Sequence, residues 1–265
     1  EACSEWLDTY QDLDENTKKS ESLIAAMEEG ITEENKALIN DIMERKDMIS
    51  KKVVWIYGGD GLAYDIGFGG LDHLIASGED INIMIVDTEV YSNTGGQSSK
   101  ATPIGATAKF AVSGKNTKKK DLGRMLMTYE NAYVSSVSMG SNPNQLINAI
   151  DEAVKFRGPS VIICYAPCIN HGLKQGMCKS HQAMRDVVST GLWPLYRFNP
   201  TIDKPFKLDY KKPTMKVKDY FMTEVRYSSL ALKYPEKAEE LFAIAQEEVD
   251  KRFETYSKLE KFYNE

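Results

Sequence analysis

Four short apolar runs alternate with helical patterns along the middle of the sequence, and this alternation constrains the fold more than any other feature. Each run is rich in β-branched or other apolar residues and is bounded by turn residues, and the four lie at 51–58, 81–89, 132–139 and 159–167. Helical periodicity separates them, at 62–77, 119–129 and 142–156. Continuous apolar strands that alternate with helices are typical of a parallel sheet covered on both faces. The sequence therefore predicts an α/β fold with one parallel sheet.

The segments on either side of this core have a different character. Residues 1–30 are polar and acidic, which predicts an N-terminal arm. After Pro194, three prolines predict an extended segment that runs over a surface, and a long charged helix with an apolar stripe follows from about Pro235. The stripe indicates packing, either on the central domain or on a partner subunit. The expected arm, central domain and C-terminal tail span 1–30, 31–199 and 200–265.

Composition excludes several classes of partner. The 265 residues are 42% hydrophobic and carry a net charge of -6, which gives no reason to expect nucleic acid or an anionic membrane surface. No apolar run approaches the roughly 20 residues that cross a bilayer, and no signal peptide is visible. Four cysteines are too few for a disulfide scaffold, so we expect reduced thiols in a cytosol-like compartment. Because the sequence begins with Glu1, we expect it to be part of a longer chain.

A glycine-rich turn with a carboxylate in its middle follows the first predicted strand. In "GGDG", Asp60 stands where glycine loops usually cradle phosphates with backbone N–H groups, and a carboxylate there would repel a phosphate. The dinucleotide fingerprint fails because Tyr64 occupies the position of its third glycine, and no G-K-[ST] follows to make a P-loop. A divalent cation reconciles the two negative groups, because Mg²⁺ takes oxygen ligands from carboxylates and phosphates together.

The next predicted strand ends in a loop that can complete such a site. This loop, "DTEVYSNTGGQSSK" at 87–100, offers hydroxyl and amide groups on a glycine-rich backbone. Ligands of open α/β sheets bind at the carboxyl ends of strands, so we predict that loops 58–62 and 88–97 lie side by side. Either stretch alone could be an ordinary turn, but two at consecutive strand ends favour one shared site.

The two loops together resemble a known cofactor signature. "GDG" followed 33 residues after its aspartate by Asn93 is similar to the signature for thiamine diphosphate and Mg²⁺. With "DTEVYSNTGGQSSK", it closely resembles the C-terminal thiamine diphosphate-binding domain of the pyruvate:ferredoxin (flavodoxin) oxidoreductase family, over about residues 50–200. The resemblance implies the thiamine diphosphate-binding fold, a parallel sheet with helices on both faces, here followed by a helical C-terminal tail.

The resemblance also implies a role for particular residues. Mg²⁺ would be bound by the side chains of Asp60 and Thr88 and by the carbonyl of Val90. The side chain of Asn93 would reach the cofactor, which makes it the expected catalytic residue of this segment. Backbone amides near the diphosphate would be those of Gly59, Gly61, Thr94 and Gly95.

Cysteine and lysine positions carry weaker signals. The family places a cysteine in a segment that matches "APCINHG", so Cys168 would be one of four thiolates around a [4Fe–4S] cluster, the other three lying outside this sequence. Cys164 lies in an apolar run and is expected to be a small core residue, whereas Cys178 is expected to be a loop thiol. The stretch "GKNTKKKD" at 114–121 is either a docking patch or a solvated loop, of which we favour the loop.

The activity implied by the resemblance is oxidative decarboxylation of pyruvate with coenzyme A to acetyl-CoA and CO₂, with electrons passing through [4Fe–4S] clusters to ferredoxin or flavodoxin. Other domains of the same chain and a second copy in a homodimer would be further partners, in the cytoplasm or, in an anaerobic eukaryote, a hydrogenosome-like organelle. We expect the chain alone to be inactive, because three cluster thiolates and the glutamate that activates the cofactor have no candidate here. The alternatives are a non-catalytic interaction module, the same domain of another 2-oxoacid oxidoreductase, or a pyruvate:NADP⁺ oxidoreductase fusion.

Overall fold

The computed structural model describes residues 1–265 and divides them into two compact units, Glu1–Val54 and Trp55–Glu265. The first unit consists of helices α1 (Ala2–Asp8), α2 (Leu13–Glu29) and α3 (Lys36–Met43) and a short 3-10 helix, η1 (Lys46–Met48). Within it, the indole N–H of Trp6 donates to the carbonyl of Ile49 at 3.0 Å and fastens the first helix to the end of the unit. Residues 31–54 therefore group with the N-terminal helices, which differs from the domain boundary that we expected.

The second unit is built on a six-stranded sheet with the order β1-β2-β4-β3-β5-β6. The first four strands in this order are parallel, as predicted, and are β1 (Trp55–Gly58), β2 (Asn82–Asp87), β4 (Ser160–Tyr165) and β3 (Tyr133–Val137). The last two, β5 (Tyr196–Phe198) and β6 (Phe206–Leu208), pair antiparallel. The segment after Pro194 thus adds an antiparallel edge to the predicted parallel sheet, which the sequence did not indicate because three-residue strands are too short to show a periodicity.

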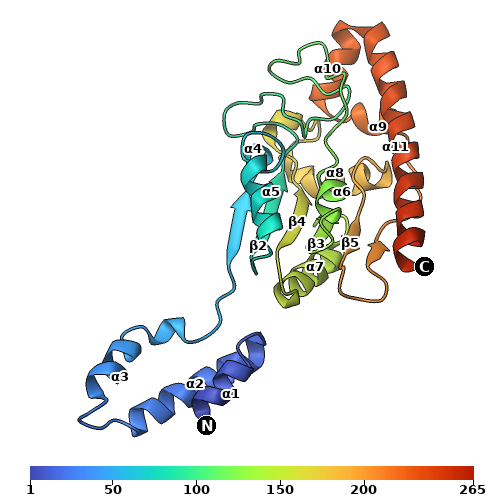
Figure 1. Cartoon of the computed structure of the whole chain (residues 1–265). Coiled ribbons are helices and arrows are strands. Elements are labelled where there is room, and N and C mark those ends of the chain that lie inside the picture. The colour runs from blue at the N-terminus through green and yellow to red at the C-terminus, as the bar shows by residue number, and fades with distance from the viewer. The chain divides into compact units, whose positions relative to one another are not determined.

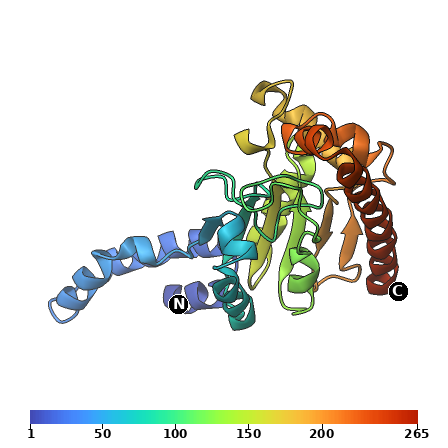
Figure 2. The same cartoon turned by 90° about the horizontal axis from the view of Figure 1, so that it is seen from above.

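Helices cover both faces of this sheet, as predicted (Figures 1 and 2). On one face, α5 (Phe68–Ser77) and α6 (Leu122–Met127) bury apolar side chains together with Ile83 and Ile85 of β2. On the other face, α7 (Pro143–Lys155) packs on Tyr133 and Ile162. The side chain of Asn142 caps α7 by accepting from the backbone N–H of Gln145 at 3.0 Å.

The first predicted helix, 62–77, is interrupted in the structure. It consists of α4 (Asp60–Tyr64) and α5, separated by a turn in which the N–H of Gly67 donates to the carbonyl of Gly61 at 2.9 Å. A Cβ on Gly67 would lie 2.6 Å from the Cα of Leu62, so only glycine allows the chain to turn this tightly. Ile66, which would share the apolar face of Leu71 and Leu74 in one continuous helix, lies in the turn and is exposed.

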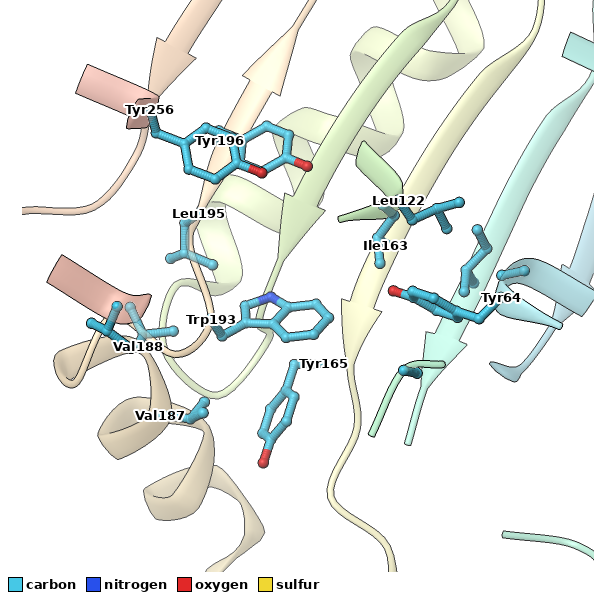
Figure 3. Packing of buried hydrophobic residues seen from close by; sticks show 14 of the residues in the cluster. Tyr64, Leu122, Ile163, Tyr165, Val187, Val188, Trp193, Leu195, Tyr196 and Tyr256 are labelled. Atoms are coloured by element: carbon cyan, nitrogen blue, oxygen red, sulfur yellow. The ribbon is translucent and has the colours of Figure 1, made fainter. Parts of the chain in front are cut away.

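The C-terminal segment folds onto the same unit. Three 3-10 and α-helical segments follow β4, namely η2 (Ile169–His171), η3 (Met177–Lys179) and α8 (Ser180–Ser189), and the chain ends in α9 (Val217–Phe221), α10 (Val225–Lys233) and α11 (Pro235–Asn264). The predicted stripe of α11 is largely buried in the main core, so it packs on its own domain (Figure 1). Figure 3 shows Tyr256 of α11 against Tyr196, with ring centroids 5.0 Å apart. None of the helices combines the length and apolar character that crossing a bilayer requires.

Candidate functional site

The carboxyl ends of three neighbouring parallel strands meet at one edge of the sheet. Gly58 at the end of β1 pairs with Ile85 of β2, and Asp87 at the end of β2 pairs with Tyr165 at the end of β4. The loops that follow these strands therefore lie beside one another. The prediction that loops 58–62 and 88–97 share this edge is confirmed.

The first of these loops places Asp60 at the start of α4, directly after Gly59. Its side chain is buried, with 3% of the residue exposed. One carboxylate oxygen accepts the backbone N–H of Thr88 at 3.0 Å, and the other is 3.4 Å from the hydroxyl of Ser99. Burial, and after it the charge of Asp87, raises the pKa of Asp60 to about 8. A buried carboxylate with so few donors is a group that a bound cation would stabilise, so this position fits a metal ion.

The second loop brings two further oxygen atoms next to Asp60. The hydroxyl of Thr88 donates to the carbonyl of Val90 at 3.0 Å, while the N–H of the same threonine is bonded to Asp60. The chain has no group of three or more His, Cys, Asp and Glu side chains that could hold a metal ion. A site here would therefore combine one carboxylate with hydroxyl and carbonyl oxygens, which is a donor set suited to Mg²⁺ bound together with a substrate phosphate.

Beyond Val90, the second loop is open to solvent and turns through glycines. Asn93, Thr94 and Gly95 are exposed, and the hydroxyl of Thr94 is bonded to Gln97 at 2.6 Å. Gly95 has a φ of 103°, and a Cβ there would lie 2.7 Å from the Nζ of Lys109. This loop thus presents an unencumbered backbone beside the buried Asp60–Val90 cluster.

Gly61, in the first loop, lies close to the second loop. A Cβ on Gly61 would lie 3.2 Å from the ring of Tyr91. The structure therefore brings the sequence-predicted residues of both loops into one neighbourhood, with Asp60, Thr88 and Val90 held together by hydrogen bonds and Asn93, Thr94 and Gly95 following in the open turn.

Lys119 is a residue of this region that the sequence analysis missed. Its Nζ lies 2.6 Å from the carboxylate of Asp87 and 3.6 Å from that of Glu89, with only 13% of the side chain exposed. The interpretation of 114–121 as a solvated loop was therefore wrong for this lysine. Two carboxylates flanking Thr88 in "DTE" are the signal that could have found it, because buried carboxylates need a cation nearby.

Arg226 of α10 supplies a second buried cation. Its guanidinium bonds Glu89 at 2.8 Å and Glu224 at 2.6 Å, and no more than 3% of any of these residues is exposed. Burial opposes ionisation of Glu89, but Arg226 and Lys119 outweigh it and hold the pKa of Glu89 below its usual range. Nothing in the local sequence around Arg226 indicated this contact.

His171 supports the same loop from the segment after β4. Its Nε2 is 2.9 Å from the carbonyl of Thr88, to which it donates. Burial, and after it the charge of Arg226, lowers the pKa of His171 to about 4, so the ring is neutral at ordinary pH. Because Nε2 carries the proton, Nδ1 is left as a lone pair without a partner in the chain.

Comparison with known proteins identifies the kind of domain. Residues 45–164, which contain both loops, match the family model described as "Thiamine pyrophosphate enzyme, C-terminal TPP binding domain". The pyruvate:ferredoxin oxidoreductase of Moorella thermoacetica is 51% identical over 97% of this chain, and the pyruvate-flavodoxin oxidoreductase of Klebsiella pneumoniae is 47% identical over 98%. The chain belongs to the pyruvate:ferredoxin (flavodoxin) oxidoreductase family. It is a thiamine diphosphate-binding domain of that family and spans 22% of the length of each of these two relatives.

A further relative carries a different name. The mitochondrial "Pyruvate dehydrogenase [NADP(+)]" of Euglena gracilis is 41% identical over 97% of the chain, which spans 14% of its length. Similarity to these family members thus extends well beyond the residues matched by the domain model, into the segment that carries Arg226.

Cys168 lies just outside that domain model, in the loop after β4. It directly precedes η2, is partly exposed and is a free thiol. Cys3 and Cys178 are exposed. Cys164, expected in the core, is partly buried and packs against the apolar cluster between α7 and the sheet.

Proposed function

We propose that this chain forms the diphosphate- and Mg²⁺-binding part of the active site of a pyruvate:ferredoxin or pyruvate:flavodoxin oxidoreductase of the pyruvate synthase type. The observation that carries the proposal is the cluster of Asp60, Thr88 and Val90, in which a buried carboxylate with few donors lies next to a hydroxyl and a carbonyl oxygen. Membership of a thiamine diphosphate-binding family supports the same reading of the cluster.

In this proposal the three oxygen-bearing groups of Asp60, Thr88 and Val90 hold Mg²⁺. Asn93 contacts the cofactor as the catalytic residue of this chain, since it lies in the open turn next to them. The amides that approach the diphosphate are those of Gly59, Gly61, Thr94 and Gly95. The close approaches at Gly61 and Gly95 support this assignment, because a side chain at either position would meet a neighbour within 3.2 Å.

The bound cofactor supplies an electron sink for decarboxylation of a 2-oxoacid. This chain's part is to bind and orient it. The neutral ring of His171 and the cations of Lys119 and Arg226 hold in place the loop that carries Thr88 and Val90, here called the metal loop. The buried side chain of Asp60 is stabilised more by a bound dication than by water molecules at the same position.

The complete protein would convert pyruvate and coenzyme A to acetyl-CoA and CO₂ and pass the electrons through [4Fe–4S] clusters to ferredoxin or flavodoxin. Cys168 would be one thiolate of the nearest cluster, and the remaining ligands would come from the rest of a longer, homodimeric protein in the cytoplasm or a hydrogenosome-like organelle. A four-iron cluster usually takes four thiolates, so we propose that the chain alone is inactive. The names of the relatives and the small share of their length that the chain spans support this part.

Two alternatives remain within the family and one outside it. The domain could serve another 2-oxoacid, or, as similarity to the Euglena protein favours, a pyruvate:NADP⁺ oxidoreductase. Outside the family's chemistry, it could be a non-catalytic interaction module. Such a module would keep the fold without needing a buried carboxyl group that has few hydrogen-bond donors. The burial of Asp60 and its raised pKa therefore favour a metal-binding, catalytic domain over an interaction module.

The deciding experiment is a calorimetric titration of the full-length protein with thiamine diphosphate, in Mg²⁺ and in a chelator. We expect binding in Mg²⁺ that the chelator abolishes, because the cation is what links the diphosphate oxygens to Asp60, Thr88 and Val90. Binding of equal strength in both buffers would overturn the metal assignment, and no binding in either would favour the interaction module.

Turnover separates the remaining alternatives. The full-length protein is mixed anaerobically with coenzyme A and either pyruvate or 2-oxoglutarate, and reduction of a viologen or of NADP⁺ is followed. Pyruvate-dependent viologen reduction is the expected result. Preference for 2-oxoglutarate, or for NADP⁺ as acceptor, would replace the proposed substrate or acceptor.

A further inference from the structure

Glu89, which stands between the two residues proposed to bind the metal, has an unusual backbone conformation. Its φ is 59°, in the left-handed region that non-glycine residues rarely adopt. This conformation turns the chain so that the carbonyl of Val90 comes back to the hydroxyl of Thr88 at 3.0 Å. Because the left-handed conformation is unfavourable for glutamate, other contacts must hold it.

The backbone of Glu89 is fastened on both sides. Its N–H donates to a carboxylate oxygen of Asp87 at 2.9 Å, and its carbonyl accepts the hydroxyl of Thr102 at 2.6 Å. These contacts come from the same loop region and would move with it. They do not by themselves explain why a charged side chain is buried at this position.

The side chain of Glu89 is held from a distant part of the chain. Arg226 reaches one carboxylate oxygen at 2.8 Å, and its other bonds fix it in turn, since its Nε lies 2.6 Å from Glu224 and its backbone carbonyl accepts Thr107. Glu224 also accepts the hydroxyl of Tyr220 at 2.6 Å. The guanidinium is therefore an immobilised anchor within α10 and not a mobile surface charge.

We propose that Arg226 is a positioning residue for the metal loop. By holding Glu89 in its left-handed conformation, it keeps the Thr88 hydroxyl and the Val90 carbonyl together as a preformed pair of oxygen ligands. The C-terminal helices, which lie beyond the family's domain model, thereby take part in cofactor binding. This inference rests on the proposed function, because it presumes that these two oxygens bind Mg²⁺.

A purely structural ion pair would behave differently. Breaking it would lower the stability of the fold and leave the metal affinity of the folded protein unchanged. A positioning role instead predicts that metal affinity falls in protein that is still folded. Residues that orient metal ligands from outside typically change metal affinity on the order of 10–100-fold when they are replaced.

The test compares Arg226→Met and Arg226→Lys with Arg252→Met in the full-length protein. Arg252 is the matched control, because it is a largely buried arginine of α11 whose hydrogen bond and ion pair go to the carbonyl of Leu192, at 2.9 Å, and to Glu248, neither of which belongs to the metal loop. The measured quantity is the dissociation constant of Mn²⁺ in the presence of thiamine diphosphate, from the paramagnetic resonance signal of free Mn²⁺. Unfolding midpoints of the same samples report stability separately.

For Arg226→Met we expect the Mn²⁺ dissociation constant to rise on the order of tenfold or more. Arg226→Lys should give a smaller rise, because lysine keeps the charge but lacks the planar fork with which the guanidinium bonds Glu89 and Glu224 through different nitrogens. Arg252→Met should stay close to wild type. In a double-mutant cycle with Glu89→Gln, the effect of Arg226→Met should largely disappear.

Two results would overturn the proposal. One is a Mn²⁺ affinity for Arg226→Met equal to that of Arg252→Met, and the other is an undiminished effect of Arg226→Met in the Glu89→Gln background. If Arg226→Met does not fold, the same comparison is made with Arg226→Lys. Failure of the proposed function is distinguishable, because wild-type protein would then bind no Mn²⁺ with thiamine diphosphate.

Discussion

The candidate site has two halves that are held in different ways. In the metal half, Asp60 and Val90 are 3% and 2% exposed, and Thr88 is hydrogen-bonded to both. In the open half, Asn93 and Thr94 are exposed, and the side chain of Asn93 makes no hydrogen bond within the chain. One half is thus held by contacts from other parts of the domain, while the other is held by contacts within its own glycine-rich turn.

The difference identifies the groups that are already ordered before the metal and the cofactor bind. A preorganised set of ligands lowers the cost of ordering side chains when the metal arrives. Exposed side chains must instead be ordered by the cofactor. We therefore expect substitutions in the metal half to change metal dependence, and substitutions in the open half to change cofactor affinity alone.

The largest expected contrast lies between two cysteines at and beyond the end of β4. Burial, and after it the charge of Asp87, raises the pKa of Cys164 to about 12. At pH 8 its thiolate fraction is then about a thousandfold below that of an ordinary thiol with a pKa of about 8.5. In protein that carries no iron–sulfur cluster, we expect iodoacetamide to label Cys168 long before Cys164, as read by mass spectrometry of peptides.

The pH dependence gives this prediction its control. Between pH 7 and 9.5 the labelling rate of Cys164 should rise about tenfold per pH unit, because the thiolate fraction grows in proportion below the pKa. The exposed thiols of Cys3 and Cys178 report the reactivity of the reagent in the same sample. Equal labelling of Cys164 and Cys168 at pH 8 would contradict the expected environment of β4.

Asp60→Asn addresses the metal half directly. We expect Mg²⁺-dependent binding of thiamine diphosphate to weaken by more than the roughly 100-fold that loss of an outer partner can cost, because a charged ligand is removed. The metal-free protein should be at least as stable as wild type, since asparagine is not repelled by Asp87 and can still accept the N–H of Thr88. Calorimetry measures the first effect and thermal unfolding the second.

The control for this substitution is Asp72→Asn on α5. Asp72 accepts the hydroxyl of Tyr129 at 2.7 Å and belongs to neither loop of the site. Its substitution should leave cofactor binding unchanged. A wild-type affinity for Asp60→Asn would remove the metal half from the site.

Gly96 tests whether the loop after β2 needs its backbone conformation, and Gly70 on α5 serves as the comparison. Gly96 has a φ of 88°, and a Cβ there would lie 2.8 Å from the Oδ1 of Asn170, so Gly96→Ala should cost about 1–2 kcal/mol of unfolding free energy. Gly70 lies in α5, and no atom lies within 4 Å of the position that a Cβ would take. Gly70→Ala should therefore increase the free energy of unfolding by about 0.5–1 kcal/mol. Urea unfolding compares the two. Shifts of the same sign would show that the loop tolerates an ordinary residue.

The sequence predicted the parallel core and both loops because these depend on local patterns. Strand runs, turn glycines and the loop after β2 are all readable within about ten residues. The anchors are not, because Arg226 meets Glu89 only through the tertiary fold, and Lys119 stands in a lysine run that resembles a solvated loop. The break at Gly67 likewise depends on a contact with Leu62 that periodicity does not contain.

The smallest expected effect tests the open half and completes the comparison. Asn93→Ala should raise the dissociation constant of thiamine diphosphate about 3- to 10-fold, the loss of one ordinary hydrogen bond, without changing its Mg²⁺ dependence. Its unfolding free energy should not change, because the side chain is exposed. Asn116→Ala, another exposed asparagine, is the control and should change neither quantity. A loss of cofactor affinity as large as that expected for Asp60→Asn, or a lower free energy of unfolding, would mean that Asn93 belongs to the metal half. The division of the site into a metal half and an open half would then be wrong.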